Sequence, residues 1–224
     1  MAGRKVPLVP GEIYHVFNRG ISLQPIFFDR RDYRRLFNAM VYYQNCDPPM
    51  KLSLFLTSSQ ENRKRFIKEI RARGNFLVEI ITYCYMLNHL HFLLRQIAEG
   101  GISTFMSNLT NSYTRYLNVK GKRNGPFFQG RFKAVRIESN EQLLHVSRYI
   151  HLNPLTSLVV GDISELEKYE YSSFPEYLSK AKENCCQKEI ILDQFRSMGA
   201  YRKFVLDQAD YQRNLEIIKH LVQE

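Results

Sequence analysis

Cysteine is scarce in this sequence, and its spacing does not match a metal-binding or disulfide framework. The four cysteines are Cys46, Cys84 and the adjacent pair Cys185 and Cys186, with no Cys-x-x-Cys among them. Structural zinc sites and small disulfide-stabilised domains depend on regularly spaced cysteine or histidine pairs. The spacing therefore argues against a structural zinc site and against a secreted, disulfide-stabilised fold.

Long apolar runs are also missing. No stretch approaches the roughly 20 residues that a membrane-spanning helix needs. Prolines, Gly11 and Glu12 interrupt the N-terminal region before any run as long as a signal-peptide core. The sequence also has no internal repeat and no low-complexity segment. These absences favour a reducing, cytoplasmic protein that does not bind a membrane.

Basic residues, in contrast, are in excess. The 224 residues include 32 Lys and Arg against 22 Asp and Glu, which gives a formal net charge of +10. Such an excess favours a polyanionic partner such as nucleic acid. The length suits one substantial core with an appended smaller unit, and we place the boundary between residues 1–154 and 155–224.

Hydrophobic periodicity predicts an α+β fold. The expected strands are 12–19, 76–86, 89–95 and 131–137, and the expected helices are 30–44, 59–73, 103–118 and 140–152. With helix 59–73 taken as an insertion, the order up to 137 is βαββαβ, the ferredoxin-like pattern. This order predicts an antiparallel sheet with helices on one face. The helix at 140–152 and a largely helical C-terminal extension would follow it.

Two histidines stand out in the stretch YCYMLNHLHFLL, residues 83–94. Alternate side chains of a strand share a face, so His89 and His91 point the same way while Leu90 and Phe92 point the other way. Both imidazoles can therefore lean toward one metal ion. An isolated His-x-His is a weak motif, however, since many sheets contain one as an ordinary core or edge feature.

A second polar stripe lies on the helix at 140–152. Val146 and Ile150 suit a buried face, whereas His145, Tyr149 and Asn153 fall at i, i+4 and i+8 on another face. Local sequence alone also allows simpler roles. Asn153, next to Pro154, is typical of a residue that ends a helix, and Tyr149 is one of fourteen tyrosines.

Several motifs together resemble the HUH single-tyrosine transposases, particularly the REP-associated type. They are YMLNHLHFLL (85–94), GPFFQGRFKA (125–134) and RYIHLNP (148–154), with HVFNRG (15–20), IFFD (26–29) and YSSF (171–174) in the same order. The resemblance covers roughly residues 10–175. One departure is Leu87, where family members commonly have proline; it alters the turn and removes no metal ligand.

The resemblance implies a mechanism and its residues. His89 and His91 would hold a divalent metal, and Asn153 matches a polar residue that completes the metal shell in related enzymes. Tyr149 would attack a single-stranded DNA phosphodiester, giving a 5′-phosphotyrosine link and a free 3′-hydroxyl. The family implies Mg or Mn, whereas imidazole ligands alone suit Zn or Mn. The partner would be single-stranded or hairpin DNA, and the choice between monomer and homodimer stays open.

A group of cations flanks the strand that leads to the helix of Tyr149. We expect these cations to contact DNA, whereas most of the interleaved phenylalanines belong to the core. The predicted DNA contacts are Lys120, Lys122, Arg123, Arg131, Lys133 and Arg136. The alternatives to a transposase-type nuclease are a catalytically idle nucleic-acid-binding module on the same fold, or a metal-dependent hydrolase of small molecules. The hydrolase explains neither the charge nor the tyrosine helix.

Overall fold

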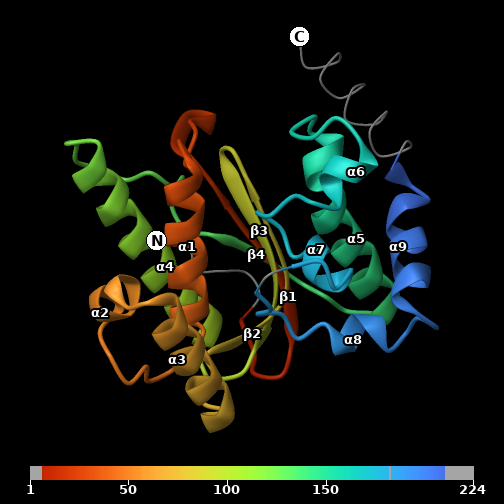
Figure 1. Cartoon of the computed structure of the whole chain (residues 1–224), viewed down its shortest axis with the longest axis horizontal. Coiled ribbons are helices and arrows are strands. Elements are labelled where there is room, and N and C mark those ends of the chain that lie inside the picture. Colours follow the sequence, from red (N-terminus) through yellow and green to blue (C-terminus); the bar gives the residue numbers. More distant parts are fainter. Residues whose placement is uncertain (1–6, 182, 210–224) are drawn as a thin grey trace.

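The structure is a computed structural model that describes residues 7–181 and 183–209. It has an α+β fold in which one antiparallel sheet separates two groups of helices (Figure 1). The strands, in the order β2-β3-β1-β4, are β1 Ile13–Arg19, β2 Val78–Met86, β3 His89–Gln96 and β4 Lys133–Arg136. The longer helices are α1 Arg30–Tyr43, α3 Gln60–Arg73, α4 Gly101–Lys120 and α5 Asn140–Thr156. The shorter ones are α2 Leu52–Thr57, α6 Ile163–Leu166, α7 Phe174–Tyr177, α8 Glu189–Leu192 and α9 Met198–Leu206.

Helices α1 and α4 cover one face of the sheet (Figure 1). Alternate strand residues such as Val16, Leu90 and Phe92 are buried beneath them. Helix α4 begins two residues before the predicted start, because the Gln96 side chain accepts a hydrogen bond from the backbone N–H of Ile102 at 3.1 Å. Gly101 permits this close approach, since a Cβ there would lie 2.1 Å from the carbonyl oxygen of Leu77.

Helix α5 lies against the opposite face of the sheet (Figure 1). Ile150 and Leu152 pack there with Ile81, Cys84 and Leu93, and all five are fully buried. The helix was predicted to end at about Leu152, but it continues through Pro154 to Thr156. Proline removes one backbone donor, yet the last turn is kept because Ser157 N–H donates to the carbonyl of Asn153 at 3.0 Å.

The segment after α5 forms hydrogen bonds to β2, the strand at one edge of the sheet. The carbonyl of Tyr171 accepts from Tyr85 N–H at 2.8 Å, and Ser173 N–H donates to the carbonyl of Tyr83 at 2.9 Å. These bonds satisfy groups that an edge strand would otherwise present to solvent. In its described part the segment holds short helices joined by longer loops. The prediction of a largely helical extension is therefore wrong for that part. The end of the predicted amphipathic pattern, residues 210–224, lies outside the described residues.

A buried hydrogen-bond network fixes α5 to its neighbours. The imidazole of His151 bonds through Nε2 to Ser173 Oγ and through Nδ1 to the Tyr201 hydroxyl, each at 2.8 Å. The same tyrosine hydroxyl lies 3.3 Å from Ser147 Oγ on α5. The network therefore holds together α5, α9 and the start of α7. Among the described residues, no helix is long and apolar enough to cross a membrane.

Candidate functional site: three histidines beside Tyr149

Strand register places three histidines on the face of the sheet that α5 covers. Residues Phe17 and His91 pair directly across β1 and β3, as do Arg19 and His89. Paired residues in an antiparallel sheet point to the same face, so His89 and His91 share a face with His15, two residues before Phe17. The predicted common face of His89 and His91 is therefore observed, at the start of β3 where it was expected.

The imidazoles are in contact with one another. His15 Nε2 lies 2.9 Å from His91 Nδ1, and the ring centroids of His89 and His91 are 5.0 Å apart. His89 Nδ1 lies 2.6 Å from the side-chain oxygen of Asn88. Sequence reasoning did not include His15 among the site residues. Its only signal was its place in the HVFNRG stretch, because the register that brings β1 beside β3 is a tertiary property.

Tyr149 reaches this cluster from α5. Its ring makes edge contacts with His91, at 5.7 Å between centroids, and with His15, at 6.0 Å. The side chain is 39% exposed, so it lies at the surface rather than in the core. The start of α5 is fixed by the Ser139 hydroxyl, which accepts from Gln142 N–H at 3.1 Å. The Gln142 side chain accepts from Glu138 N–H at 2.7 Å.

The two competing tyrosines lie elsewhere. Tyr113 and Tyr116 belong to α4, on the opposite face of the sheet. The Tyr113 hydroxyl is buried and donates to the carbonyl of Ile26 at 2.7 Å. The Tyr116 hydroxyl donates to the Asp32 carboxylate at 2.8 Å. Both tyrosines pack on the face that α1 and α4 cover, so the sheet lies between them and the histidines.

Burial keeps the imidazoles neutral. It lowers the pKa of His15 to about 4 and that of His89 to about 4, and for His89 the nearby Arg19 guanidinium adds to the effect. The pKa of His91 is lowered well below its ordinary value by burial and by the two neighbouring histidines. A neutral imidazole retains a lone pair on one ring nitrogen, which is the form that binds a metal ion.

Asn153 lies one turn beyond Tyr149 on α5. It is buried, and its side-chain nitrogen has no hydrogen-bond partner. Buried amides normally satisfy their polar atoms, so this unpaired N–H group is unusual. The amide oxygen of the same side chain is the atom that could bind a cation. The donor set, neutral imidazoles and an amide, fits a divalent metal ion.

The predicted DNA-contacting cations separate into two groups. Lys133 pairs across the sheet with Phe17, so it stands on the face that carries the histidines, and it is exposed. Lys122 and Arg131 are exposed as well. Arg123 stacks on the ring of Phe127, at 4.1 Å from the centroid. The phenylalanines Phe127 and Phe128 are buried, which confirms their predicted place in the core.

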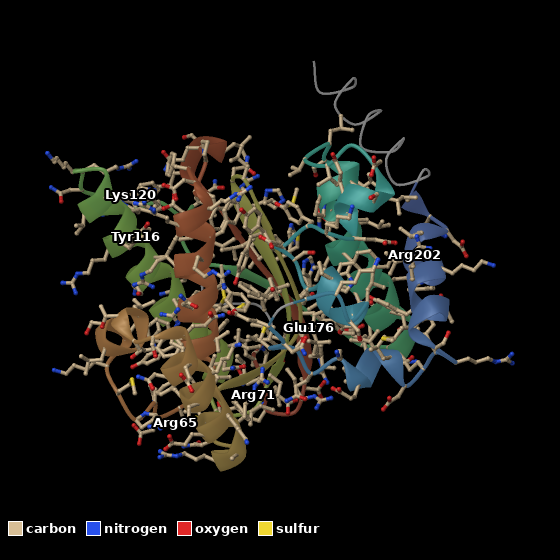
Figure 2. All side chains as sticks on the ribbon, in the orientation of Figure 1. Arg65, Arg71, Tyr116, Lys120, Glu176 and Arg202 are labelled. Carbon is tan, nitrogen blue, oxygen red and sulfur yellow. The ribbon has the colours of Figure 1, made fainter. Side chains whose placement is uncertain are left out.

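Lys120 and Arg136, in contrast, are bound to carboxylates. Lys120 Nζ lies 2.6 Å from Asp32 and 2.9 Å from Asp29 (Figure 2). Arg136 pairs with Glu12 at 2.6 Å. Asp32 is fully buried, so the charge of Lys120 already stabilises the start of α1.

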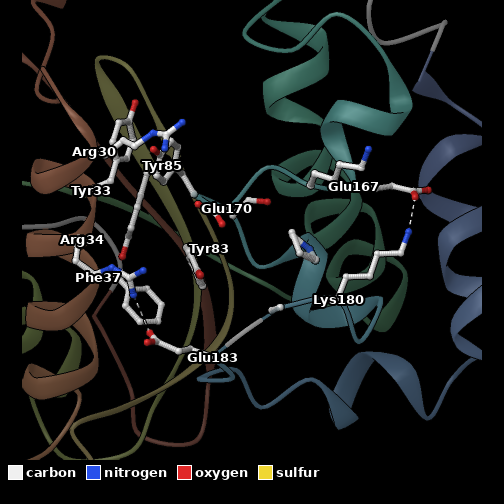
Figure 3. A pocket seen from close by; sticks show the side chains of 15 residues that line it. Arg30, Tyr33, Arg34, Phe37, Tyr83, Tyr85, Glu167, Glu170, Lys180 and Glu183 are labelled. Atoms are coloured by element: carbon white, nitrogen blue, oxygen red, sulfur yellow. Dashed lines mark hydrogen bonds and ion pairs between the residues drawn. The ribbon is translucent and has the colours of Figure 1, made fainter. Parts of the chain in front are cut away.

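A cavity of about 480 Å³ lies away from the histidines. It opens between α1 and the segment after α5, beside the edge strand β2 (Figure 3). Its walls carry Tyr33, Phe37 and Tyr83, and Arg34 is paired with Glu183 at 3.2 Å. None of the histidines lines this cavity.

Residues 50–153 match the family model described as Transposase IS200 like. Over this region the chain is similar to the IS200-like transposases. The resemblance read from the motifs is thereby confirmed, and the matched region contains His89, His91 and Tyr149. No curated protein matches the chain in sequence.

The chain is also similar in fold to a solved structure. That structure is a REP-associated tyrosine transposase bound to a REP hairpin, with a TM-score of 0.55 and 15% sequence identity. The similarity covers 80% of this chain and 87% of the other. At this identity the likeness concerns the fold, and it includes more than the region matched by the family model.

Proposed function

We propose that this protein is a metal-dependent HUH single-tyrosine transposase that cleaves and rejoins single-stranded or hairpin DNA. The observation that carries the proposal is the edge contact of the Tyr149 ring with His91 and His15. A nucleophile at the surface is then in ring contact with two neutral, largely buried imidazoles. This combination is what a tyrosine-mediated attack on a phosphodiester needs.

The hydrogen bonds of the histidines support a metal site. Because the Asn88 oxygen can only accept, His89 donates through Nδ1–H and keeps its lone pair on Nε2. In the tautomer in which His91 donates through Nδ1–H to His15, its Nε2 lone pair is free in the same way. Partners of this kind orient metal-binding imidazoles. His89, His91 and Asn153 would hold Mg or Mn, which supplies charge stabilisation for a phosphate under attack.

The chain's own residues account for the chemical step. The Tyr149 oxygen forms a bond to phosphorus as its hydroxyl proton passes to water, and the bond from phosphorus to the 3′-oxygen breaks. That oxygen takes up a proton and becomes a free 3′-hydroxyl. The 5′-phosphotyrosine retains the bond energy, so a second 3′-hydroxyl can reverse the step without ATP.

Cations near the histidines would hold the strand. Arg19 pairs with His89 across the sheet, and Lys133 lies beside Phe17. Both are exposed, so each can neutralise a phosphate. We propose Lys122, Arg123 and Arg131 as further phosphate contacts. Arg136 pairs across the sheet with Tyr14, on the face that α1 and α4 cover, and it would have to release Glu12 before it could bind DNA. The structurally similar transposase is bound to a REP hairpin, which motivates hairpin DNA as the substrate.

We also propose a division of the chain into two parts. We assign catalysis to residues 1–154, with residues 155–224 as an extension that supports α5 and the sheet edge. The protein would act in the cytoplasm, as a monomer or as a homodimer in which the tyrosine of one chain serves the site of the other.

A cleavage assay tests the proposal. The protein is incubated with single-stranded hairpin DNA from the flanks of its gene, with Mg or Mn, and the products are separated on a denaturing gel. The His89→Ala, His91→Ala double variant should fold by circular dichroism, retain much of its DNA affinity and lose cleavage. His145→Ala, at an exposed histidine of α5, is the matched control. Binding without cleavage by the parent protein would identify an idle nucleic-acid-binding module instead.

A further inference from the structure

A second group of side chains with potential metal-binding atoms lies far from the histidines in sequence. Ligand atoms of Glu176, Cys185 and Cys186 all lie within 4.8 Å of one another. Glu176 belongs to the short helix α7, and the two cysteines belong to the loop before α8. Sequence spacing gave no sign of this group, because its carboxylate lies nine residues before the first thiol and completes no recognised ligand pattern.

We propose that Cys185, Cys186 and Glu176 form a binding site for a thiophilic divalent cation such as zinc. Two thiolates and one carboxylate are three protein ligands of the types that zinc accepts, and the fourth position is left for water. The site would have a structural role. It is independent of the proposed DNA chemistry, which uses imidazoles on another surface.

The carboxylate is already held in a fixed position. Its two oxygens accept hydrogen bonds from the backbone N–H groups of Cys185, at 3.0 Å, and Cys186, at 2.9 Å. Each carboxylate oxygen has a second lone pair that remains for a cation. Glu176 is 1% exposed and Cys185 is 5% exposed, so the ligands are ordered by packing before any ion arrives.

A cavity of about 350 Å³ gives an ion access to the group. The three ligands line it together with Arg71 and Lys188 (Figure 2 labels Glu176 and Arg71). Two thiolates and a carboxylate exceed the charge of a divalent cation by one, and these two basic side chains can balance it. Burial raises the pKa of Glu176 and that of Cys186. Because the thiolate is the form that binds a metal ion, binding would release the thiol protons.

The position of the group indicates what the ion would do. Gln187 N–H, next to Cys186, donates to the carbonyl of Ile80 at 2.8 Å. The cysteine loop is therefore attached to the edge strand β2, beside the irregular register between Ile80 and Thr82. A bound ion would link α7, this loop and the sheet edge, and it would stabilise the packing beneath α5.

Cadmium titration of the full chain tests the site. The His89→Ala, His91→Ala background removes the imidazole site, so that the thiolate-to-cadmium absorption band reports on the cysteines alone. The expected result is one Cd²⁺ per chain, with release of two protons and displacement by Zn²⁺ but not by excess Mg²⁺. The melting temperature should rise by several degrees when the ion is in large excess over its dissociation constant.

Variants separate this site from other thiols. In the same background Cys185→Ser and Cys186→Ser should each lose the band, whereas Cys46→Ser, at an exposed cysteine, should keep it. Glu176→Gln should weaken binding at least tenfold; if it fails to fold, the two serine variants decide. Two results overturn the proposal. One is a folded parent protein that gives no band, and the other is a band in both serine variants that is as strong as the band of the parent.

Discussion

The imidazoles of His15 and His91 lie 2.9 Å apart, nitrogen to nitrogen, although 76 residues separate them in the chain. Antiparallel pairing of β1 with β3 creates this contact, which only one of the two nitrogens can make as a donor. The donor's other nitrogen then retains its lone pair. When His91 is the donor, its Nε2 is the nitrogen that remains to bind a metal ion.

His15→Ala should weaken metal binding. Without its partner the His91 ring loses the hydrogen bond that fixes its tautomer, and loss of such a partner typically costs 10–100-fold in metal affinity or activity. Mn²⁺ binding by calorimetry and cleavage on a gel should fall together. His145→Ala is the control, and an unchanged Mn²⁺ affinity in a folded His15→Ala protein would exclude this role.

Lys133→Glu should reduce DNA affinity and its salt dependence. Lys133 is exposed on the histidine face, and each single-stranded phosphate contact contributes about −0.7 to the logarithmic salt slope. The slope should flatten in a salt titration with a fluorescent oligonucleotide. Arg65→Glu reverses a charge on the distant helix α3 and should leave the slope unaltered. If both reversals have the same effect, the DNA lies elsewhere.

Lys120→Met should reduce stability more than DNA binding. It removes the ion pair at 2.6 Å from the buried Asp32 carboxylate, which keeps its hydrogen bond from the Tyr116 hydroxyl. A hydrogen bond to a charged group contributes about 1.5–3 kcal/mol. Urea unfolding measures the loss. Lys122→Met, at an exposed neighbour, should stay within about 0.5 kcal/mol of the parent protein. A stable Lys120→Met protein with weak DNA binding would return Lys120 to the DNA surface.

Stability should fall in acid through Glu167. Burial of this carboxyl acts to raise its pKa, but hydrogen bonds from Lys180, at 2.6 Å, and from Arg202 outweigh burial and lower it. A depressed carboxyl pKa stabilises the fold above the ordinary glutamate range, and this contribution is lost as pH falls through the lowered pKa. The bases are about half exposed, so each pair contributes at most about 1 kcal/mol.

Glu167→Gln is the variant that checks this linkage. Thermal unfolding from neutral pH to pH 3 should show a shallower loss of stability in the variant than in the parent. The difference should vanish in strong acid, where both side chains are neutral. Parallel pH profiles would contradict the assignment.

Local signals made much of the fold predictable. Alternation identified β2 and β3 with the turn at Leu87 and Asn88, and Ser139 marked the start of α5. These features depend on neighbouring residues. The end of α5 was misplaced because burial against the sheet, a property of the whole fold, retains a final turn that Pro154 alone would discourage.

The site was predictable only in part, for the same physical reason. His89 and His91 share a face by strand geometry, and the spacing of Tyr149 placed it off the buried face of its helix. His15 joins them only through the β1–β3 register. The sequence also could not show that Lys120 forms an ion pair with Asp32, or that Glu176 accepts hydrogen bonds from two cysteines. Each contact depends on how distant segments pack.

The most direct test of the account is to trap and map the covalent adduct. The parent protein is incubated with hairpin DNA and Mn²⁺, the adduct is digested, and the modified peptide is identified by mass spectrometry, beside Tyr149→Phe protein. Removing only the attacking oxygen should leave folding, metal binding and DNA binding intact. The account predicts DNA on Tyr149 and no adduct in the variant; DNA on any other tyrosine, or an adduct that persists in Tyr149→Phe, would contradict it.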